Sequence, residues 1–235
     1  MGKGTIYLIP TELAPSTGSQ VLGQKALDII KQLDTFLVED IRTSRRFISS
    51  LRLGLTIEEL DFHELDKKTG TEKINEYIKL VQAGKSVGVM SEAGSPGVAD
   101  PGAALVAKAH ELGLKVQPLV GPSSFLLSLM ASGMNGQRFR FHGYLPIDRT
   151  KRQAALLALD KDARQLKEAQ MFMETPYRNN HMLEDILGVC QKHTRLCIAS
   201  DITGDGEQIK TLTIAQWKGK KLDLYKIPTV FVLQG

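Results

Sequence analysis

Short apolar segments rich in β-branched residues alternate with helical segments along the whole chain, and this alternation constrains the fold most strongly. The segments predicted as strands are 5–10, 35–40, a short one near 61–65, 86–91, 115–120, 138–145, 170–175, 195–200, 208–214 and 229–235. Helices are predicted over 19–33, about 43–52, 71–82, 103–112, 124–132, about 150–168 and 176–193. Helices placed between strands are typical of parallel crossover connections, so we expect an α/β fold.

The length of 235 residues allows one large domain or two smaller ones, each with its own hydrophobic core. Strands cluster late in the chain, which indicates a mixed sheet in the second half. The segment around Gly121-Pro122 is the best candidate for a boundary. We therefore expect domains over 1–118 and 119–235, each a mostly parallel or mixed sheet flanked by helices.

The composition excludes several classes of protein. It is 42% hydrophobic and 24% charged, and no apolar run approaches the roughly 18 residues of a membrane span. The N-terminal residues lack the apolar core of a signal peptide, and the two cysteines, Cys190 and Cys197, are typical of buried thiols in a reducing compartment. No GxGxxG or HExxH pattern occurs, so we expect no dinucleotide fingerprint and no metal site. A cytoplasmic protein without membrane contact is predicted.

Positive charge is concentrated in two short runs of a chain whose net charge is +4. Residues 41–57 contain four arginines and no acid, and residues 149–152 open a later helix with three cations. Either run alone is equally consistent with a solvated helix face. Together they favour a polyanionic partner such as RNA. The candidate RNA contacts are Arg42, Arg45, Arg46, Arg149, Lys151 and Arg152.

The stretch SEAGSPGVADPG at 91–102 follows a predicted strand and is an unusually constrained loop. Gly94 and Gly97 permit positive φ angles and a close approach of backbone to a ligand, while Pro96 and Pro101 stiffen the chain. Asp100 and Pro101 are favoured at the cap and the first position of a helix, which accounts for the end of the loop. Its first part is predicted to form the rim of a binding site, because open α/β sheets bind ligands at the carboxyl ends of strands.

Other loops follow predicted strands in the same way. Residues 120–124 (VGPSS), 173–178 (METPYR) and 7–13 (YLIPTEL) each come at or after the end of an apolar segment. The helix after 120–124 offers its first amides to Ser123 or to an anion. These loops are expected to contribute to one site with residues 91–102.

Six pieces occur in the order YLIPT, VEDIRTSRRF, SEAGSPGVADPG, VGPSS, FHGYLP and METPYR. In this order they resemble the tetrapyrrole methylase superfamily of S-adenosylmethionine-dependent methyltransferases, and most closely its branch that methylates a ribose 2′-hydroxyl of small-subunit ribosomal RNA. The resemblance covers nearly the whole chain. It implies a two-domain α/β fold with the cofactor in the cleft between the domains, and a homodimer.

The resemblance also implies a set of cofactor contacts. They are Pro10, Leu13, Glu92, Ala93, Gly94, Ser95, Val98, Ser123, Ser124, Met173, Thr175, Pro228 and Thr229.

Transfer of a methyl group is an in-line displacement, so positioning supplies much of the catalysis, and a hydroxyl acceptor also needs a group that takes its proton. The candidate proton acceptors are Glu39, Asp40 and Glu174, with Arg42 positioning an anionic substrate. Glu39 and Asp40 can equally serve as caps of the following helix.

The chain departs from the ribosomal branch on the acceptor side. The branch continues its first strand as PTPIGN and carries an Arg-Glu-Leu-Thr run after a late strand, whereas this chain has PTELAPS and, at 200–207, SDITGDGE. Ribose 2′-O-methylation of small-subunit ribosomal RNA is the favoured function. The alternatives are methylation of a small molecule such as a tetrapyrrole, and a module that binds the cofactor without catalysis.

Overall fold

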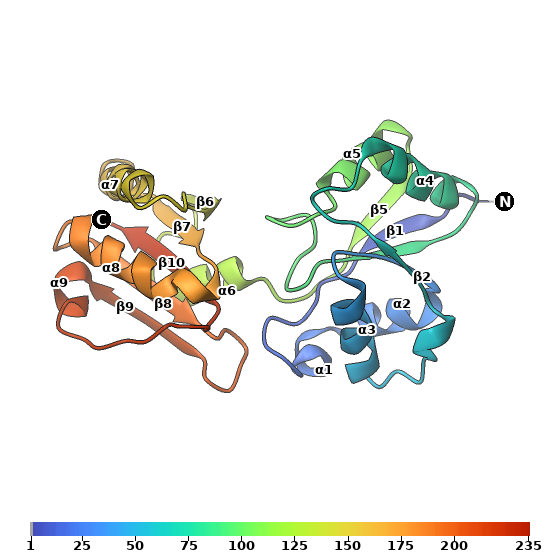
Figure 1. Cartoon of the computed structure of the whole chain (residues 1–235), viewed down its shortest axis with the longest axis horizontal. Coiled ribbons are helices and arrows are strands. Elements are labelled where there is room, and N and C mark those ends of the chain that lie inside the picture. Colours follow the sequence, from blue (N-terminus) through green and yellow to red (C-terminus); the bar gives the residue numbers. More distant parts are fainter. Residues whose placement is uncertain (1) are drawn as a thin grey trace. The chain divides into compact units, whose positions relative to one another are not determined.

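A computed structural model describes residues 2–235, which divide into two compact units, 2–123 and 124–235 (Figure 1). Each of the segments predicted as strands forms a strand. Within residues 2–235 no helix is both long enough and apolar enough to cross a membrane.

Unit 1 is a five-stranded parallel sheet in the order β3-β2-β4-β1-β5. Its strands are β1 (Thr5–Leu8), β2 (Thr35–Val38), β3 (Asp61–Glu64), β4 (Val87–Met90) and β5 (Lys115–Pro118). Its helices are α1 (Gly18–Val21), α2 (Gln24–Gln32), α3 (Ile41–Ser50), the 3-10 helix η1 (Ile57–Glu59), α4 (Thr71–Gln82) and α5 (Ala103–Glu111).

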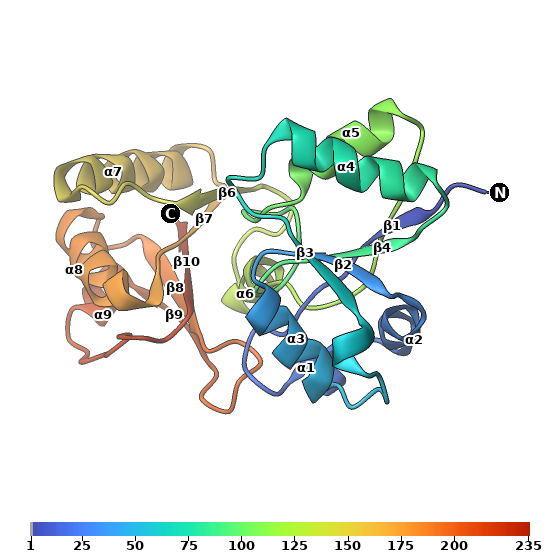
Figure 2. The ribbon, with the colours of Figure 1, turned by 45° about the vertical axis from the view of Figure 1, so that its right-hand side comes forward.

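Both faces of the unit 1 sheet are covered, as Figure 2 shows, with α4 and α5 on one side and α1 to α3 on the other. Successive residues of β2 alternate between two hydrophobic clusters: Phe36 and Val38 pack with α2 and α3, whereas Leu37 packs with α4 and α5. This is the pattern of a strand buried on both faces, and it explains the nearly continuous apolar runs of the sequence.

The predicted helix over 19–33 is wrong as one helix, because it breaks at Leu22-Gly23 into α1 and α2. Gly23 is the cap of α2 and has an extended backbone with ψ of 152°. The break places Leu22 in the same buried cluster as Ile29 and Ile30. Apolar spacing carried across the break, so periodicity alone did not indicate it.

Unit 2 is a five-stranded mixed sheet in the order β6-β7-β10-β8-β9, in which only the β6–β7 pair is parallel. Its strands are β6 (Phe139–Tyr144), β7 (Ala169–Met173), β8 (Arg195–Ser200), β9 (Gln208–Thr213) and β10 (Thr229–Gln234). Its helices are α6 (Ser124–Ser132), α7 (Arg149–Gln165), the 3-10 helix η2 (Pro176–Arg178), α8 (Asn179–Val189) and α9 (Ile214–Trp217). The predicted mixed sheet is confirmed.

One cluster fills the core of unit 2, where α7, α8 and α9 pack on the face that carries Phe172 and Phe231. On the other face, Thr211 lies opposite Cys197 in the β8–β9 ladder, and its hydroxyl donates to the carbonyl of Ser132 in α6 at 2.7 Å. Cys190 and Cys197 are both buried and free, and burial raises the pKa of Cys190 to about 12. The thiols are therefore packing groups.

Gly88 in β4 provides a test of how tightly the unit 1 sheet is packed. A Cβ atom at this position would lie 2.6 Å from Cδ1 of Ile9 and 2.9 Å from Cδ1 of Phe36. We expect Gly88→Ala to lower the free energy of unfolding by about 1–3 kcal/mol in urea titrations, because the side chains around it must move.

Gly188 in α8 is the contrasting variant, since a Cβ there meets nothing within 4 Å. Gly188→Ala should raise stability by about 0.5–1 kcal/mol through helix propensity. Equal effects of the two substitutions would contradict this account of the sheet.

Candidate functional site

The loops of unit 1 gather at one edge of its sheet, because all five strands are parallel and end there. β1 and β4 are neighbours, with β2 beside β4 and β5 beside β1. The segments that follow them, 9–13, 39–40, 91–102 and 119–123, are therefore brought together. Open α/β sheets bind ligands at this edge.

Hydrogen bonds tie three of these loops to the loop 91–102. The backbone N–H of Thr11 donates to the carbonyl of Gly94 at 2.8 Å, and its hydroxyl donates to the carbonyl of Ser91 at 3.3 Å. The hydroxyl of Ser95 donates to the carbonyl of Pro122 at 3.3 Å. The N–H of Glu92 donates to the carboxylate of Glu39 at 3.3 Å. The loop after β4 is thus fastened to those after β1, β2 and β5.

The backbone of this loop adopts conformations that favour glycine. Gly94 has φ of 75° and Gly97 has φ of 82°, which confirms the positive φ angles predicted for both. Ala99 also lies in the left-handed region, at 62°, although it carries a Cβ. The loop is therefore held in one strained shape by its surroundings.

The predicted cap at Asp100 is wrong. Helix α5 begins at Ala103, its cap is Gly102 with φ of 122°, and Pro101 lies outside the helix. The loop therefore extends to Gly102, and the side chain of Asp100 does not cap the helix.

Close contact between the β1 and β5 loops depends on Gly121. A Cβ atom there would lie 2.4 Å from Cβ of Pro10, so only glycine permits this approach. At Gly94, a Cβ would lie 3.2 Å from Cδ2 of Leu13. Pro10 and Leu13, both predicted to contact the cofactor, thus line the same edge as residues 91–102.

Ser123 carries a buried polar group suited to a ligand. The residue is 8% exposed, and among the described residues its hydroxyl has no hydrogen-bond partner. Buried hydroxyls in proteins are nearly always hydrogen-bonded, so this oxygen fits a contact to a polar cofactor. Glu92, Ala93 and Val98 are exposed in the adjoining loop.

Three carboxyl groups lie close together at the ends of β2 and β4. Burial and the neighbouring Glu39 raise the pKa of Asp100 to about 6. Burial and Glu39 also raise the pKa of Glu92. Sequence reasoning missed Asp100 as a titrating group because it assigned the residue to a cap. A carboxyl group with a pKa near neutrality can accept a proton at physiological pH.

Asp40 has a structural role. It is the cap of α3, where its carboxylate accepts the N–H of Thr43 at 2.7 Å, and this hydrogen bond lowers its pKa. Because its pKa is lowered, the carboxylate of Asp40 is a weak proton acceptor. Of the two alternatives for Asp40, the geometry supports the cap.

Four of the predicted cofactor contacts in unit 2, Met173, Thr175, Pro228 and Thr229, lie at the end of β7. Met173 lies opposite Val230 in the antiparallel β7–β10 ladder, so Pro228 and Thr229 run alongside Thr175. The hydroxyl of Thr229 donates to the carbonyl of Ile227 at 2.9 Å. Ser124, the first residue of α6, receives a hydrogen bond at its carbonyl from the hydroxyl of Ser128 at 2.6 Å.

Glu174 is buried and paired within unit 2. Its Oε1 accepts a hydrogen bond from Nη2 of Arg178 at 2.6 Å and another from the N–H of Thr175 at 2.7 Å. Among the described residues its Oε2 has no hydrogen-bond partner. The ion pair with Arg178 argues for a positioning role rather than for proton transfer.

The first basic run forms a charged cleft. Arg42, Arg45 and Arg46 are exposed on α3 and line a hollow of about 510 Å³ together with Asp40, Ile41 and Glu64. The guanidinium of Arg45 also lies 5.3 Å from the ring centre of Phe62. The three predicted contacts therefore share one accessible surface.

The second basic run is divided. Arg152 is buried, with 7% of its side chain exposed, and its guanidinium donates to Asp185 and to the carbonyl of Ile147. Arg149 donates to the same carboxylate at 3.0 Å but is largely exposed, as is Lys151. The prediction of Arg152 as an RNA contact is wrong, because its buried guanidinium is paired with Asp185 inside the fold.

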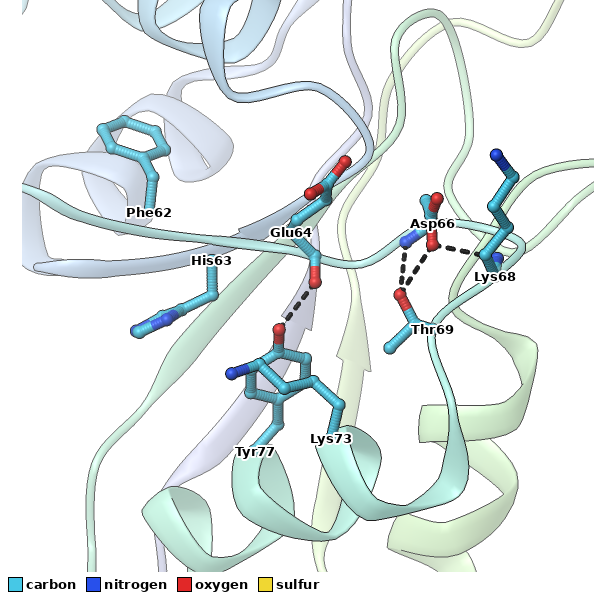
Figure 3. A pocket seen from close by; sticks show the side chains of 8 residues that line it. All are labelled: Phe62, His63, Glu64, Asp66, Lys68, Thr69, Lys73 and Tyr77. Atoms are coloured by element: carbon cyan, nitrogen blue, oxygen red, sulfur yellow. Dashed lines mark hydrogen bonds between the residues drawn. The ribbon is translucent and has the colours of Figure 1, made fainter.

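A further hollow of about 420 Å³ lies between β3 and α4, as Figure 3 shows. Its polar groups engage protein partners. The hydroxyl of Tyr77 donates to the carbonyl of Glu64 at 2.6 Å, and the hydroxyl of Thr69 donates to the carboxylate of Asp66 at 2.9 Å. The ring of His63 is hydrogen-bonded to the carboxylate of Asp61 at 2.8 Å. These contacts account for the residues that line it, and we assign it no function.

Comparisons with known proteins bear on the family and on the fold. A family profile described as "Tetrapyrrole (Corrin/Porphyrin) Methylases" matches residues 18–217. The ribosomal RNA small subunit methyltransferase I of Vibrio cholerae is 29% identical over 92% of this chain and 70% of its own length.

Two solved structures share the fold. The methyltransferase CobJ matches with a TM-score of 0.66 at 16% identity, over 100% of this chain and 95% of its own. A uroporphyrin-III C-methyltransferase from Thermus thermophilus, complexed with S-adenyl homocysteine, matches with a TM-score of 0.56 at 16% identity, over 98% and 97% of the chains. The predicted α/β fold class is confirmed.

The raised pKa of Asp100 predicts a pH-dependent gain in stability for Asp100→Asn. The folded protein binds a proton more tightly than the unfolded chain, whose value is 3.8, so ionisation destabilises the fold as pH rises through about 6. We expect Asp100→Asn to be more stable than wild type by about 1–2 kcal/mol at neutral pH, after allowance for partial exposure, with the difference vanishing near pH 4.

Asp40→Asn is the matched control, because the pKa of Asp40 is lowered and the sign reverses. That variant should lose stability at neutral pH and match wild type in acid. Urea titrations at both pH values measure each pair. A loss of stability for Asp100→Asn at neutral pH would show that its carboxylate is favourably paired.

Proposed function

The chain belongs to the tetrapyrrole methylase family, and on that premise we propose that it transfers a methyl group from S-adenosylmethionine to a ribose 2′-hydroxyl of small-subunit ribosomal RNA. The observation that carries the substrate is the relative from Vibrio cholerae, which matches 92% of the chain and is named for that RNA. The exposed arginine cleft on α3 supports a polyanionic substrate.

In the proposed reaction S-adenosylmethionine supplies an electrophilic methyl group on a sulfonium. The shaped backbone of residues 93–98 and the hydroxyl of Ser123 would hold the polar ends of the cofactor. Alignment of donor and acceptor within this site provides much of the rate.

Asp100 is the best proton acceptor among the carboxyl groups. Asp40 caps a helix and Glu174 is paired with Arg178, whereas Asp100 is half-buried beside Glu39 with a pKa of about 6. In the proposed step Asp100 would accept the hydroxyl proton of the ribose while the oxygen bonds to the methyl carbon, whose bond to the sulfonium sulfur breaks and leaves neutral S-adenosylhomocysteine. Glu39 acts by raising the proton affinity of Asp100 and by fixing the N–H of Glu92.

A tetrapyrrole or another small molecule is the second candidate substrate. The description of the family and the fold shared with a uroporphyrin-III C-methyltransferase favour it. We further propose that the protein acts in the cytoplasm as a homodimer. Analytical ultracentrifugation tests whether it is a dimer.

Methyl transfer to isolated ribosomal subunits tests the proposed activity. Labelled S-adenosylmethionine and the protein are incubated with small subunits from cells that lack the protein. We expect label in the RNA at a linkage that resists alkaline hydrolysis, because a 2′-O-methyl group blocks attack on the adjacent phosphate. A parallel incubation with uroporphyrinogen tests the second candidate.

Two outcomes of this experiment would count against the proposal. Label in the tetrapyrrole alone would show that a tetrapyrrole, and not ribosomal RNA, is the substrate. A folded protein that binds the cofactor but labels neither RNA nor tetrapyrrole would remove both candidates.

The arginine cleft predicts a large effect of charge reversal on RNA binding. Arg45→Glu combined with Arg46→Glu should weaken binding to small-subunit RNA at least about tenfold and lower the dependence of affinity on salt. Lys25→Glu combined with Lys31→Glu, which reverses two exposed charges on α2, is the matched control. Equal losses in both pairs would assign the effect to net charge alone.

A further inference from the structure

Two tyrosine rings lie exposed side by side on unit 2. Tyr177 in η2 is 63% exposed and Tyr225, in the segment before β10, is 52% exposed. Their ring centres are 6.0 Å apart and their planes meet at 71°. Large exposed aromatic side chains contribute little to a core, and a pair of them on one surface indicates a binding role.

The chain segments that carry these rings are fixed to each other. The N–H of Lys226 donates to the carbonyl of Pro176 at 3.0 Å, and the amide of Asn179 donates to the carbonyl of Ile227 at 2.6 Å. The N–H of Leu224, a buried residue, donates to the side chain of Asn180 at 2.7 Å. The rings are therefore presented by an ordered scaffold, which reduces the entropy lost on binding.

The chain segment that carries Tyr225 is rich in lysine. The ammonium of Lys226 lies 5.4 Å from the ring centre of Tyr225. Lys218, Lys220 and Lys221 are exposed in the preceding residues. The single acid of residues 217–228, Asp223, accepts hydrogen bonds from Asn180 and from the N–H of Tyr225, which lower its pKa. The surface attracts anions.

We propose that Tyr177 and Tyr225 form a stacking platform for unpaired nucleotides of the RNA substrate, with Lys226 and the lysines of 218–221 holding the adjoining phosphates. The inference rests on the proposed function, and it specifies that the part of the RNA substrate bound at these rings is single-stranded. Aromatic faces stack on any base, and lysines neutralise the backbone without regard to sequence.

The angle between the rings favours RNA over a tetrapyrrole. A rigid planar macrocycle cannot lie flat on two rings that meet at 71°. Successive bases of a flexible single strand can tilt independently, so each ring offers a face to a different base.

The platform adjoins the predicted cofactor contacts of unit 2. Tyr177 follows Thr175 by two residues, and Tyr225 precedes Pro228 by three. Met173 and Val230 are opposite each other in the β7–β10 ladder. The segment after β7 that carries Tyr177 and the segment before β10 that carries Tyr225 therefore lie at the same edge of the unit 2 sheet. A nucleotide stacked there lies next to the unit 2 residues that the family resemblance assigns to the cofactor, Met173, Thr175, Pro228 and Thr229.

Substitution of each tyrosine tests the platform in the full chain. The probe is a fluorescein-labelled single-stranded RNA of about twelve nucleotides and mixed sequence, with the corresponding duplex as comparison. Tyr177→Ala and Tyr225→Ala should each weaken binding of the single strand about five- to tenfold, with little effect on the duplex. Phenylalanine at either position should retain most of the affinity, because its ring also stacks.

Leu157→Ala is the matched control, since it removes an apolar side chain that is 50% exposed on α7. It should leave RNA affinity unchanged. Lys220→Gln combined with Lys221→Gln should lower the salt dependence of binding, whereas the tyrosine variants should leave it unaltered. Circular dichroism and thermal unfolding show whether each variant is folded.

The outcomes separate this inference from the proposed function. If wild type methylates and binds RNA while folded Tyr177→Ala and Tyr225→Ala bind the single strand as well as it does, the platform is wrong and the function stands. If wild type binds no RNA, the ribosomal substrate and the platform both fall. Loss of uroporphyrin binding without loss of RNA binding assigns the rings to a tetrapyrrole, and a shift from dimer to monomer in sedimentation assigns them to a second copy.

Discussion

Parallel pairing of β1 with β4 in the middle of the unit 1 sheet is the constraint on which the candidate site depends. Strands that run in one direction end at one edge, so the segments after them meet wherever they lie in the sequence. The pairing itself depends on apolar side chains that alternate between two buried clusters and on Gly88, which leaves room for Ile9 and Phe36. Packing in the core thus determines where Thr11, Gly94 and Pro122 come together.

Much of this arrangement could be predicted from the sequence. Apolar runs indicated the buried strands β2, β4 and β10, because a strand buried on both faces must be apolar. The positive φ angles of Gly94 and Gly97 followed from their place in a tight loop. Long-range contacts escaped prediction. Apolar periodicity continued across the break at Gly23, and the burial of Arg152 depends on Asp185, which is far away in the sequence. Asp100 satisfied a local capping rule that the backbone of the loop overrode.

The carboxyl groups near the two sheet edges illustrate how surroundings divide the roles of similar side chains. Asp40 meets the N-terminal amides of α3, so its charged form is stabilised. Asp100 is partly buried and lies near the negative charge of Glu39, so its neutral form is stabilised. Glu174 meets a guanidinium. Residue type alone marks all three as acids, and only their neighbours distinguish a cap, a titrating group and an ion pair.

Each unit has hydrophobic clusters drawn entirely from its own residues, 2–123 for one and 124–235 for the other. A substitution that alters the surface of unit 2 therefore leaves the packing beneath the loops of unit 1 unchanged. Residues on the surface of unit 2, such as the segment 200–207 and the tyrosine pair, can be exchanged without disturbing the packing that shapes the loop 91–102. Such modularity offers a physical route by which one scaffold serves acceptors as different as a polymer and a macrocycle.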